Sequence, residues 1–470
     1  MLSATSASYS LVLSMVSPAL ETIRISLHTD QFGISWVLTA YLLSGAMLTP
    51  IVGRLGDRYG KKQLLIGALG VLVIGSLVSA SALTLPVMIV GRVLQGAGGA
   101  VLPLAFGLIR DNNPAHKVGS SVGIVAATSS VGGGIGVVIA GPIVESLGVH
   151  WLFLLPAIAN AVIAVVLLFV IPAGARAANG GVNWLAALLL SAALVCLLLP
   201  LSLGSQMGWL SVNTLLLFAG AIIFGALWVL VELRAKFPLI DMRVFRLRPV
   251  WTANLASLLV GVGLYSAMGF IPSFLQVPRG TGYGLGATAT QSGLLFVPTT
   301  LAMLITGLLA GPLTRALRPK TVLILGAIPP IISFGLLAFA REGWEIVVAI
   351  AIGGLGFGVA LSALSAVVVH AVPASQTGAA AGMNANIRTI GGAIGAAIFA
   401  SILGSHQGAL GFPTGAGYTI AFTTLGVAGV LSLLACIIIP ARGGGQARRA
   451  RQEDTEELRA DELLDQHSPF

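Results

Sequence analysis

The chain has 470 residues, of which 56% are hydrophobic and only 9% are charged, and its mean hydropathy is +0.97. Soluble globular domains carry about 25% charged residues, so this composition excludes a water-soluble domain and indicates that lipid is the main solvent of the chain. The formal net charge of +9 is spread thinly over short segments, and we therefore predict no nucleic-acid partner.

Apolar runs follow one another along the chain, each with roughly the 20 residues that a helix needs to cross a hydrocarbon core of about 30 Å. Glycine and proline inside such runs do not argue against spans, because neighbouring helices satisfy the freed backbone groups. We predict an all-α membrane protein with fourteen transmembrane helices, near residues 3–24, 33–52, 64–83, 85–109, 118–142, 151–172, 183–203, 211–231, 251–276, 289–311, 321–340, 345–368, 377–404 and 417–440.

The distribution of lysine and arginine predicts the orientation, because basic residues are retained in short cytoplasmic loops. With the N-terminus inside, the outer loops hold only Arg24, Arg279 and Arg341. The inner loops hold fifteen basic residues: Arg54, Arg58, Lys61, Lys62, Arg110, Lys117, Arg176, Arg234, Lys236, Arg243, Arg246, Arg248, Arg315, Arg318 and Lys320. One missed span would invert every later loop, so this asymmetry supports fourteen spans with both termini cytoplasmic, in the plasma (inner) membrane.

An internal repeat is indicated by residues that recur at a nearly constant offset. Gly53, Leu55 and Lys62 recur 258 residues later, and a longer series recurs after 259 residues; its members are Pro114, Gly119, Gly123, Gly132, Gly133, Ile135 and Gly136. Chance matching among 60 glycines is the alternative. Parallel repeats of this kind predict a six-helix half at 1–172, two inserted helices at 173–236, a second half at 237–440 and a charged cytoplasmic tail at 441–470.

The run from Gly53 to Lys62 is the most specific motif, with glycines and charges between the second and third spans. Small residues such as Gly53 and Gly60 let helix ends approach, and Asp57 with Arg58, Lys61 and Lys62 can form an ion cluster that breaks as the halves move. The run resembles the signature of the major facilitator superfamily nearly position for position. The resemblance implies that fold and a cytoplasmic latch formed by Asp57, Arg58 and Lys62.

The fourth predicted span contains Arg92 and Gln95 one turn apart, followed by Gly96. An arginine at membrane depth costs at least about 2.5 to 3.5 kcal/mol, so we expect Arg92 to face a cavity or a partner. The stretch resembles the span 4 signature of the family, which implies a part in proton transfer. A structural arginine bonded to backbone carbonyls is the alternative.

The fifth predicted span is rich in small residues, with Gly132, Gly136, Gly141 and Pro142 in one run. Glycines at this density permit close helix packing and local bending. The run resembles the antiporter signature of exporter branches, although Val137 replaces the proline of the usual Gly-Pro step.

Two further stretches, Phe237–Arg246 and Met383–Gly392, resemble the fourteen-helix drug:proton antiporter branch, a multidrug efflux group. The resemblance covers about residues 9–440. It implies a secondary active transporter that exports hydrophobic drugs or metabolites by alternating access, in exchange for protons and without a cofactor, with the proton motive force as energy source. Uptake or facilitated diffusion of a small nutrient, and a non-transporting receptor, are the alternatives.

The proton-carrying group is harder to place, because the branch usually has an aspartate early in span 1 where this chain has Val12. Proton coupling needs a group that changes protonation between states. We predict Glu21 and Glu145 as candidates, with a place at the lipid headgroup boundary as the alternative for each. If neither titrates, coupling would fall to Asp57 with Arg92 or be absent.

A substrate cavity is predicted between spans 1, 2, 4, 5, 9, 10 and 13. Its candidate lining residues are Tyr41, Gln95, Tyr265, Phe270, Gln276, Asn384 and Arg388, with ordinary helix packing as the alternative for each. Because few acids are buried, a hydrophobic neutral or anionic substrate is favoured over a strongly cationic one. The sequence shows no metal spacing, phosphate loop or catalytic carboxylate pair, so we expect no enzyme and no metal, and a monomer in the bilayer.

Overall fold

A computed structural model describes residues 1–29, 31–170, 183–235, 238, 242–372, 377–408 and 412–440 of the chain. These residues form helices joined by short loops, which confirms the predicted all-α class. The predicted tail at 441–470 lies outside the described residues, as do residues 171–182, 236–237 and 239–241 around the predicted inserted helices.

The first part of the chain supplies eight α-helices and one 3-10 turn. They are α1 (Leu2–Ser14), α2 (Val16–Ser26), α3 (Gln31–Tyr59), α4 (Lys61–Ala80), α5 (Leu85–Gln95), η1 (Gly96–Ala100), α6 (Val101–Asn112), α7 (Ala115–Ser146) and α8 (Trp151–Val170). Two helices follow where the inserted pair is predicted, α9 (Trp184–Met207) and α10 (Val212–Arg234).

The later part of the chain repeats this pattern of long apolar helices. Its elements are α11 (Met242–Phe245), α12 (Arg248–Gln276), η2 (Arg279–Thr281), α13 (Ala289–Leu295), α14 (Val297–Ala316), α15 (Pro319–Phe339), α16 (Gly343–Ala371), α17 (Thr377–Ser405) and α18 (Gly415–Ile438).

Thirteen helical segments among the described residues are long and apolar enough to cross a membrane, and they match the second to fourteenth predicted spans. The predicted first span is divided into α1 and α2, which have 13 and 11 residues and meet at Met15. Pro18 accounts for the division, because proline has no backbone N–H to donate to the carbonyl four residues earlier, at Ser14. Neither helix alone has the length of a spanning helix.

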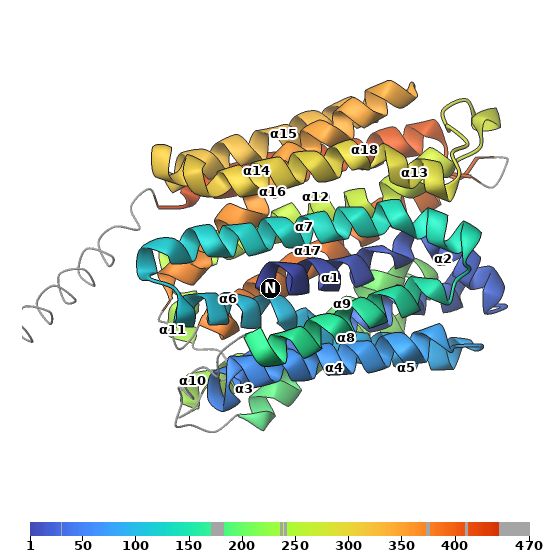
Figure 1. Cartoon of the computed structure of the whole chain (residues 1–470). Coiled ribbons are helices and arrows are strands. Elements are labelled where there is room, and N and C mark those ends of the chain that lie inside the picture. Colours follow the sequence, from blue (N-terminus) through green and yellow to red (C-terminus); the bar gives the residue numbers. More distant parts are fainter. Residues whose placement is uncertain are drawn as a thin grey trace, which may run out of the picture.

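The same helix pairings occur in both parts of the chain. Helix α1 packs along α7 as α12 packs along α17, and α3 packs on α5 as α14 packs on α16. Helix α4 lies between α5 and α8, and α15 lies between α16 and α18. In Figure 1, α15, α16 and α18 form the upper part of the molecule and α4, α5 and α8 the lower part, with α1, α7, α12 and α17 between them.

Two groups of contacts join the two parts. On one side α7 packs against α14 and α16, where the Ser362 hydroxyl donates to the Gly123 carbonyl at 3.2 Å. On the other side α17 packs against α3 and α6, where the Asn386 amide donates to the Ala46 carbonyl at 2.6 Å. The inserted helix α9 covers this second side, because it packs against both α3 and α17 as well as α10.

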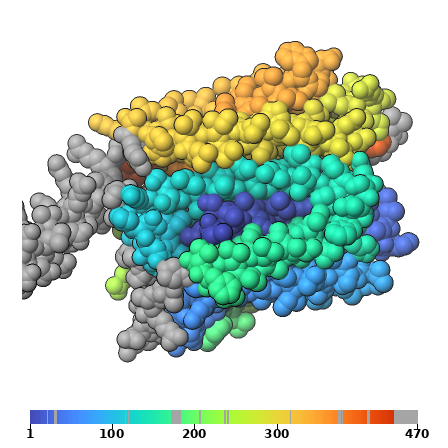
Figure 2. Space-filling model, in the orientation of Figure 1, coloured from blue at the N-terminus to red at the C-terminus, as the bar shows by residue number. Residues whose placement is uncertain are grey.

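Close helix contacts depend on glycines of the fifth predicted span, which is α7. Figure 2 shows the dark blue N-terminal residues lying in a groove beside α7, and α1 packs on both α7 and α8. A Cβ on Gly132 would collide with the backbone of Ala7 in α1, whereas a Cβ on Gly123 would lie 3.9 Å from the Cβ of Ser362, an ordinary contact. Gly132 therefore sets the distance between α1 and α7.

We predict that Gly132→Ala lowers the free energy of unfolding by about 1–3 kcal/mol, because backbone on the opposite helix must move to admit the methyl group. Thermal unfolding of the purified protein in detergent can be followed with a thiol-reactive dye, since Cys436 is buried and Cys196 half-buried. Gly123→Ala is the matched control and should be neutral or slightly stabilising, because alanine is the better helix former. Equal transition temperatures for the two variants would contradict the packing role of Gly132.

Candidate functional site

A cavity of about 560 Å³ lies among the helices of both parts of the chain. Its walls come from α1, α2, α3, α6, α7, α9, α12, α14, α16 and α17. Much of the lining is apolar, including Leu13, Leu20, Leu38, Val137 and Phe270. Small-molecule sites typically measure about 300–1,000 Å³ and combine apolar walls with a few polar groups, so this cavity has the size and character of a ligand site.

The largest polar groups of the cavity are three tyrosines and one arginine. Tyr9 lies within electrostatic range of Tyr41, Tyr265 and Arg388, and all four line the cavity. Arg388 is the one charged residue among the described residues of the lining, which include no aspartate or glutamate. The electrostatic field of the cavity is therefore positive.

Four of the seven predicted cavity residues line this space, namely Tyr41, Tyr265, Phe270 and Arg388. The other three lie elsewhere. Asn384 donates from its amide to Asn254 Oδ1 at 2.8 Å and Ser257 Oγ at 2.9 Å and lines only a small adjoining cavity. Gln276 is the last residue of α12, and Gln95 is buried beside Arg92.

Arg92 is fully buried and held by several partners. Its Nε donates to the Val37 carbonyl at 2.9 Å and its Nη1 to Gln95 Oε1 at 2.6 Å, while its guanidinium lies 4.4 Å from the centre of the Tyr41 ring. Gln95 in turn donates to Ser76 Oγ at 2.9 Å. Arg92 thus ties α5 to α3 in the way that the structural alternative expected, and its part in proton transfer stays a prediction.

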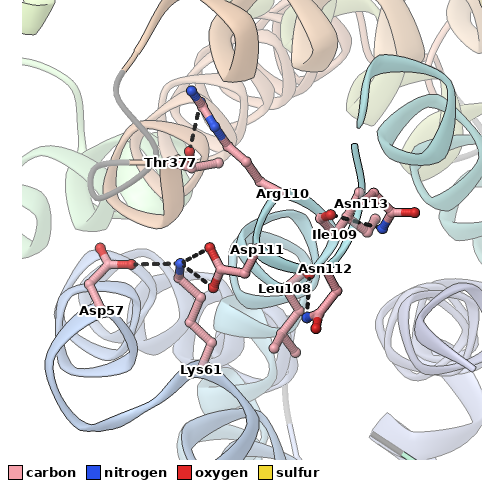
Figure 3. Close-up of polar contacts among 9 residues, drawn as sticks. All are labelled: Asp57, Lys61, Leu108, Ile109, Arg110, Asp111, Asn112, Asn113 and Thr377. Atoms are coloured by element: carbon pink, nitrogen blue, oxygen red, sulfur yellow. Dashed lines mark hydrogen bonds and ion pairs between the residues drawn. The ribbon is translucent and has the colours of Figure 1, made fainter. Parts of the chain in front are cut away.

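An ion cluster with buried Asp57 and Lys61 and exposed Asp111 occupies the end of the molecule where α3 meets α4, which we call the charged end. Lys61 Nζ donates to both carboxylate oxygens of Asp111 at 2.7 and 2.9 Å and lies 3.7 Å from Asp57 Oδ1 (Figure 3). Asp57 is 4% exposed, and its carboxylate accepts no hydrogen bond from the described residues. Lys61 is therefore held chiefly by Asp111, a residue outside the motif from Gly53 to Lys62.

The other residues of the predicted latch also have partners near them. The Arg58 guanidinium lies 4.8 Å from the centre of the Tyr59 ring, and Lys62 Nζ donates to the Leu168 carbonyl of α8 at 2.9 Å. Gly60 has φ of 110° between α3 and α4, a conformation that favours glycine, and Gly53 is buried within α3. The contacts described for Arg58, Lys61 and Lys62 all lie within the first eight helices.

Arg110 makes the contact across the two parts at the charged end. Its Nη1 donates to the Val369 carbonyl of α16 and to Thr377 Oγ1 of α17, the latter at 2.9 Å. Figure 3 shows Arg110 pointing towards Thr377 while the neighbouring Asp111 points towards Lys61. In the sequence Arg110 is one of the basic residues expected in the cytoplasmic loops. The inside preference for positive charge already explains such a cation, so nothing in the sequence marks this contact.

The two predicted glutamate candidates lie towards the opposite end. Glu145 is exposed at the end of α7, where it accepts from Thr290 Oγ1 of α13 at 2.6 Å. Glu21 belongs to α2, and its side chain lies outside the described residues.

The predicted packing residues of α7 reach neighbouring helices: a Cβ on Gly136 would meet Leu11 of α1, one on Gly141 would meet Thr290, and Pro142 lies inside the helix.

These observations define the class of protein: a helical membrane protein of duplicated packing that encloses a cavity for a small molecule between its two parts. The model of one protein family, the Major Facilitator Superfamily, matches residues 2–396 and again residues 253–464. The chain belongs to the Major Facilitator Superfamily. It is a multi-pass membrane transporter and not an enzyme, as predicted.

Relatives with names that refer to drug resistance or export resemble most of the chain. The cephamycin export protein CmcT of Amycolatopsis lactamdurans is 30% identical over 83% of this chain and 82% of that protein. The multidrug transporter protein MdtP of Bacillus subtilis is 28% identical over 85% and 75%. The tetracenomycin C resistance and export protein of Streptomyces glaucescens is 26% identical over 85% and 73%. The predicted resemblance to the drug-efflux branch is thereby confirmed.

Two solved structures share the fold at low sequence identity. The human organic anion transporter MFSD10 superposes with a TM-score of 0.67 at 13% identity, covering 93% of this chain and 98% of that one. The proton:xylose symporter XylE superposes with a TM-score of 0.65 at 15% identity, covering 93% and 94%. The first is named as an organic anion transporter and the second as a proton:xylose symporter, so the shared fold does not determine substrate or direction.

We predict that Asp57→Asn impairs transport but leaves membrane insertion intact, because the amide keeps the shape of the side chain and Lys61 keeps Asp111. Transport by purified protein in proteoliposomes and the amount of protein in the membrane would be measured together. Asp111→Asn should instead lower stability by about 1–2 kcal/mol, since it removes the close charged acceptor of Lys61. Normal turnover in Asp57→Asn would contradict the assignment of Asp57 to the latch.

Proposed function

We propose that this transporter exports hydrophobic drugs or metabolites by alternating access, in exchange for protons. The observation that carries the proposal is the apolar cavity between two parts of duplicated packing, because a binding space shared by two rigid parts is what a rocking mechanism requires. Two of the relatives, from Amycolatopsis lactamdurans and Streptomyces glaucescens, are named as export proteins, which supports the outward direction.

The cavity has unequal ends, which supports an outward-facing arrangement. Towards the charged end its lining residues Phe106, Ala126 and Ser365 are buried, and Arg110 ties the two parts together beyond them. Towards the opposite end Ser17 is half-buried and Ser273 is exposed. With the charged end at the cytoplasm, a ligand in this cavity would reach the outside before the inside.

The topology that we propose counts α1 and α2 together as the first span. Residues 2–26 remain helical on both sides of Met15, whose own backbone dihedral angles are helical. About 25 residues at 1.5 Å each are enough to cross a bilayer. With the thirteen spanning helices this makes fourteen, and an even number places both termini on one side, the cytoplasmic side by the distribution of basic residues.

Asp57 is the proton-carrying candidate that the contacts favour. Protonation of its carboxylate would break no hydrogen bond among the described residues, and Lys61 would keep its two bonds to Asp111. Glu145 is exposed and bonded to Thr290, and Arg92 is tied to α3. Loss of charge at Asp57 would therefore release the ion pair with Lys61 at small cost, and the proton motive force would supply the energy without a cofactor.

Drug accumulation in cells with and without the protein tests export. Expression should lower the accumulation of a hydrophobic fluorescent drug, and a proton uncoupler should restore it to the level of cells that lack the protein. Asp57→Asn, expressed at the same level, serves as the inactive control. Higher accumulation on expression would show uptake instead, and no change for any compound of a chemically varied panel would support a non-transporting receptor.

Arg110 joins the two parts at the charged end and is predicted to hold this end of the cavity closed. Arg110→Ala removes the hydrogen bonds to α16 and α17, so the outward-facing population should fall and the charged end should open more often. Electron paramagnetic resonance distances between spin labels at Lys117 and Arg318 would report the opening as a longer component. Arg246→Ala, which changes an exposed arginine, should leave the distances unchanged, and an unchanged distribution in Arg110→Ala would contradict the closure.

A further inference from the structure

Arg388 is a cation at membrane depth that has no hydrogen-bond or ion-pair partner among the described residues. Its side chain lines the cavity from α17, and its Nε is buried without a hydrogen bond. The ion pairs between described residues join Lys61 to Asp57 and Asp111 and do not reach Arg388. A charged side chain within a spanning helix costs free energy unless it pairs or faces a water-filled cavity. No contact among the described residues offsets this cost for Arg388.

Other polar residues within the spanning helices have hydrogen-bond partners. Arg92 is held by a carbonyl, an amide and an aromatic ring. On α17 itself, Asn384 and Asn386 donate to groups of α12 and α3. Polar groups close to Arg388 are thus used to join helices, whereas its guanidinium is left facing the cavity.

Arg388 lies towards one end of the cavity. Arg388 also lines a small adjoining cavity with Phe106, Ser365 and Ala385, which places it near the closed, charged end. The tyrosines Tyr9 and Tyr265 lie within electrostatic range of one another. In the other direction the lining includes Leu20, Ile34, Leu38, Val137 and Phe270, with no acid among the described lining residues.

We propose that Arg388 binds the carboxylate of an amphipathic anion whose apolar body fills the rest of the cavity. An arginine fork matches a carboxylate with two parallel hydrogen bonds, and tyrosine hydroxyls nearby can donate to the same group. The apolar walls provide the hydrophobic contribution to binding. This inference rests on the proposed function, since it assigns a substrate class to the same cavity, and it makes Arg388 the residue that determines charge specificity.

The test measures binding, without transport, to the full-length protein in phosphatidylcholine nanodiscs. Three probes share one apolar body and differ in charge: pyrenebutyrate, its methyl ester, and the pyrenylbutyl trimethylammonium cation. Energy transfer from the protein's seven tryptophans to pyrene gives the affinity, and empty nanodiscs give the partition background. The wild-type protein should bind the carboxylate about tenfold or more tightly than the ester, and the cation most weakly.

Variants separate a binding role from a structural one. Arg388→Gln should remove the preference for the carboxylate and leave the affinity for the ester unchanged, because the ester reports an intact cavity. Arg388→Lys should keep part of the preference, since it keeps the charge without the fork. Arg246→Gln is the matched control for loss of an exposed arginine and should bind all three probes like the wild type.

Several results would overturn the proposal: no binding of pyrenebutyrate, equal affinity for carboxylate and ester, or an unchanged carboxylate preference in Arg388→Gln. If Arg388→Gln loses the ester as well, Arg388→Lys decides. Loss of the carboxylate preference in Arg388→Lys, with ester binding retained, would then overturn the proposal. None of these results bears on export itself, which the accumulation assay tests separately. Export without carboxylate preference would leave the proposed function standing and remove the substrate class.

Discussion

The structure depends above all on how a chain with 9% charged residues places its cations where water is scarce. Each buried charge in such a setting needs a partner, because desolvation is costly. Lys61 meets this need with Asp111 and Asp57, and Arg92 meets it with the Val37 carbonyl and its neighbours. Each solution joins two helices, so the charges that are hardest to bury also fix the arrangement of the first part of the chain.

Glycine has the complementary role of bringing helices together where no charge is present. Gly132 lets α7 approach the backbone of α1, and Gly391 does the same for α17 against Leu258 of α12. These two contacts lie in equivalent positions of the duplicated packing. Tight pairs of this kind make each part rigid, and the space that remains between the parts is the cavity. The cavity is thus enclosed by two parts that are each tightly packed.

The contacts between the parts differ at the two ends, and this difference links the structure to transport. At the charged end Arg110 donates to α16 and α17, while at the opposite end Glu145 accepts from Thr290 of α13. Single hydrogen bonds of this kind can be exchanged at modest cost. An alternating-access mechanism needs such a division between permanent and exchangeable contacts.

The sequence alone determined the spanning helices, the family and the ion-rich motif. Hydropathy and the spacing of glycines and charges are local properties of the chain, so they are visible without the tertiary structure. It also contained the cause of the break at Met15, since Pro18 is visible in the sequence, although the first span was predicted as one piece. Only the tertiary structure decided that Lys61 pairs mainly with Asp111, 50 residues away, and that Arg110 contacts the other part. It likewise decided that Arg92 donates hydrogen bonds to two neighbours, whereas the buried Nε of Arg388 has no partner among the described residues. Both are arginines within apolar helices, and their difference lies in which neighbours from distant segments come within hydrogen-bonding distance, which no local pattern specifies.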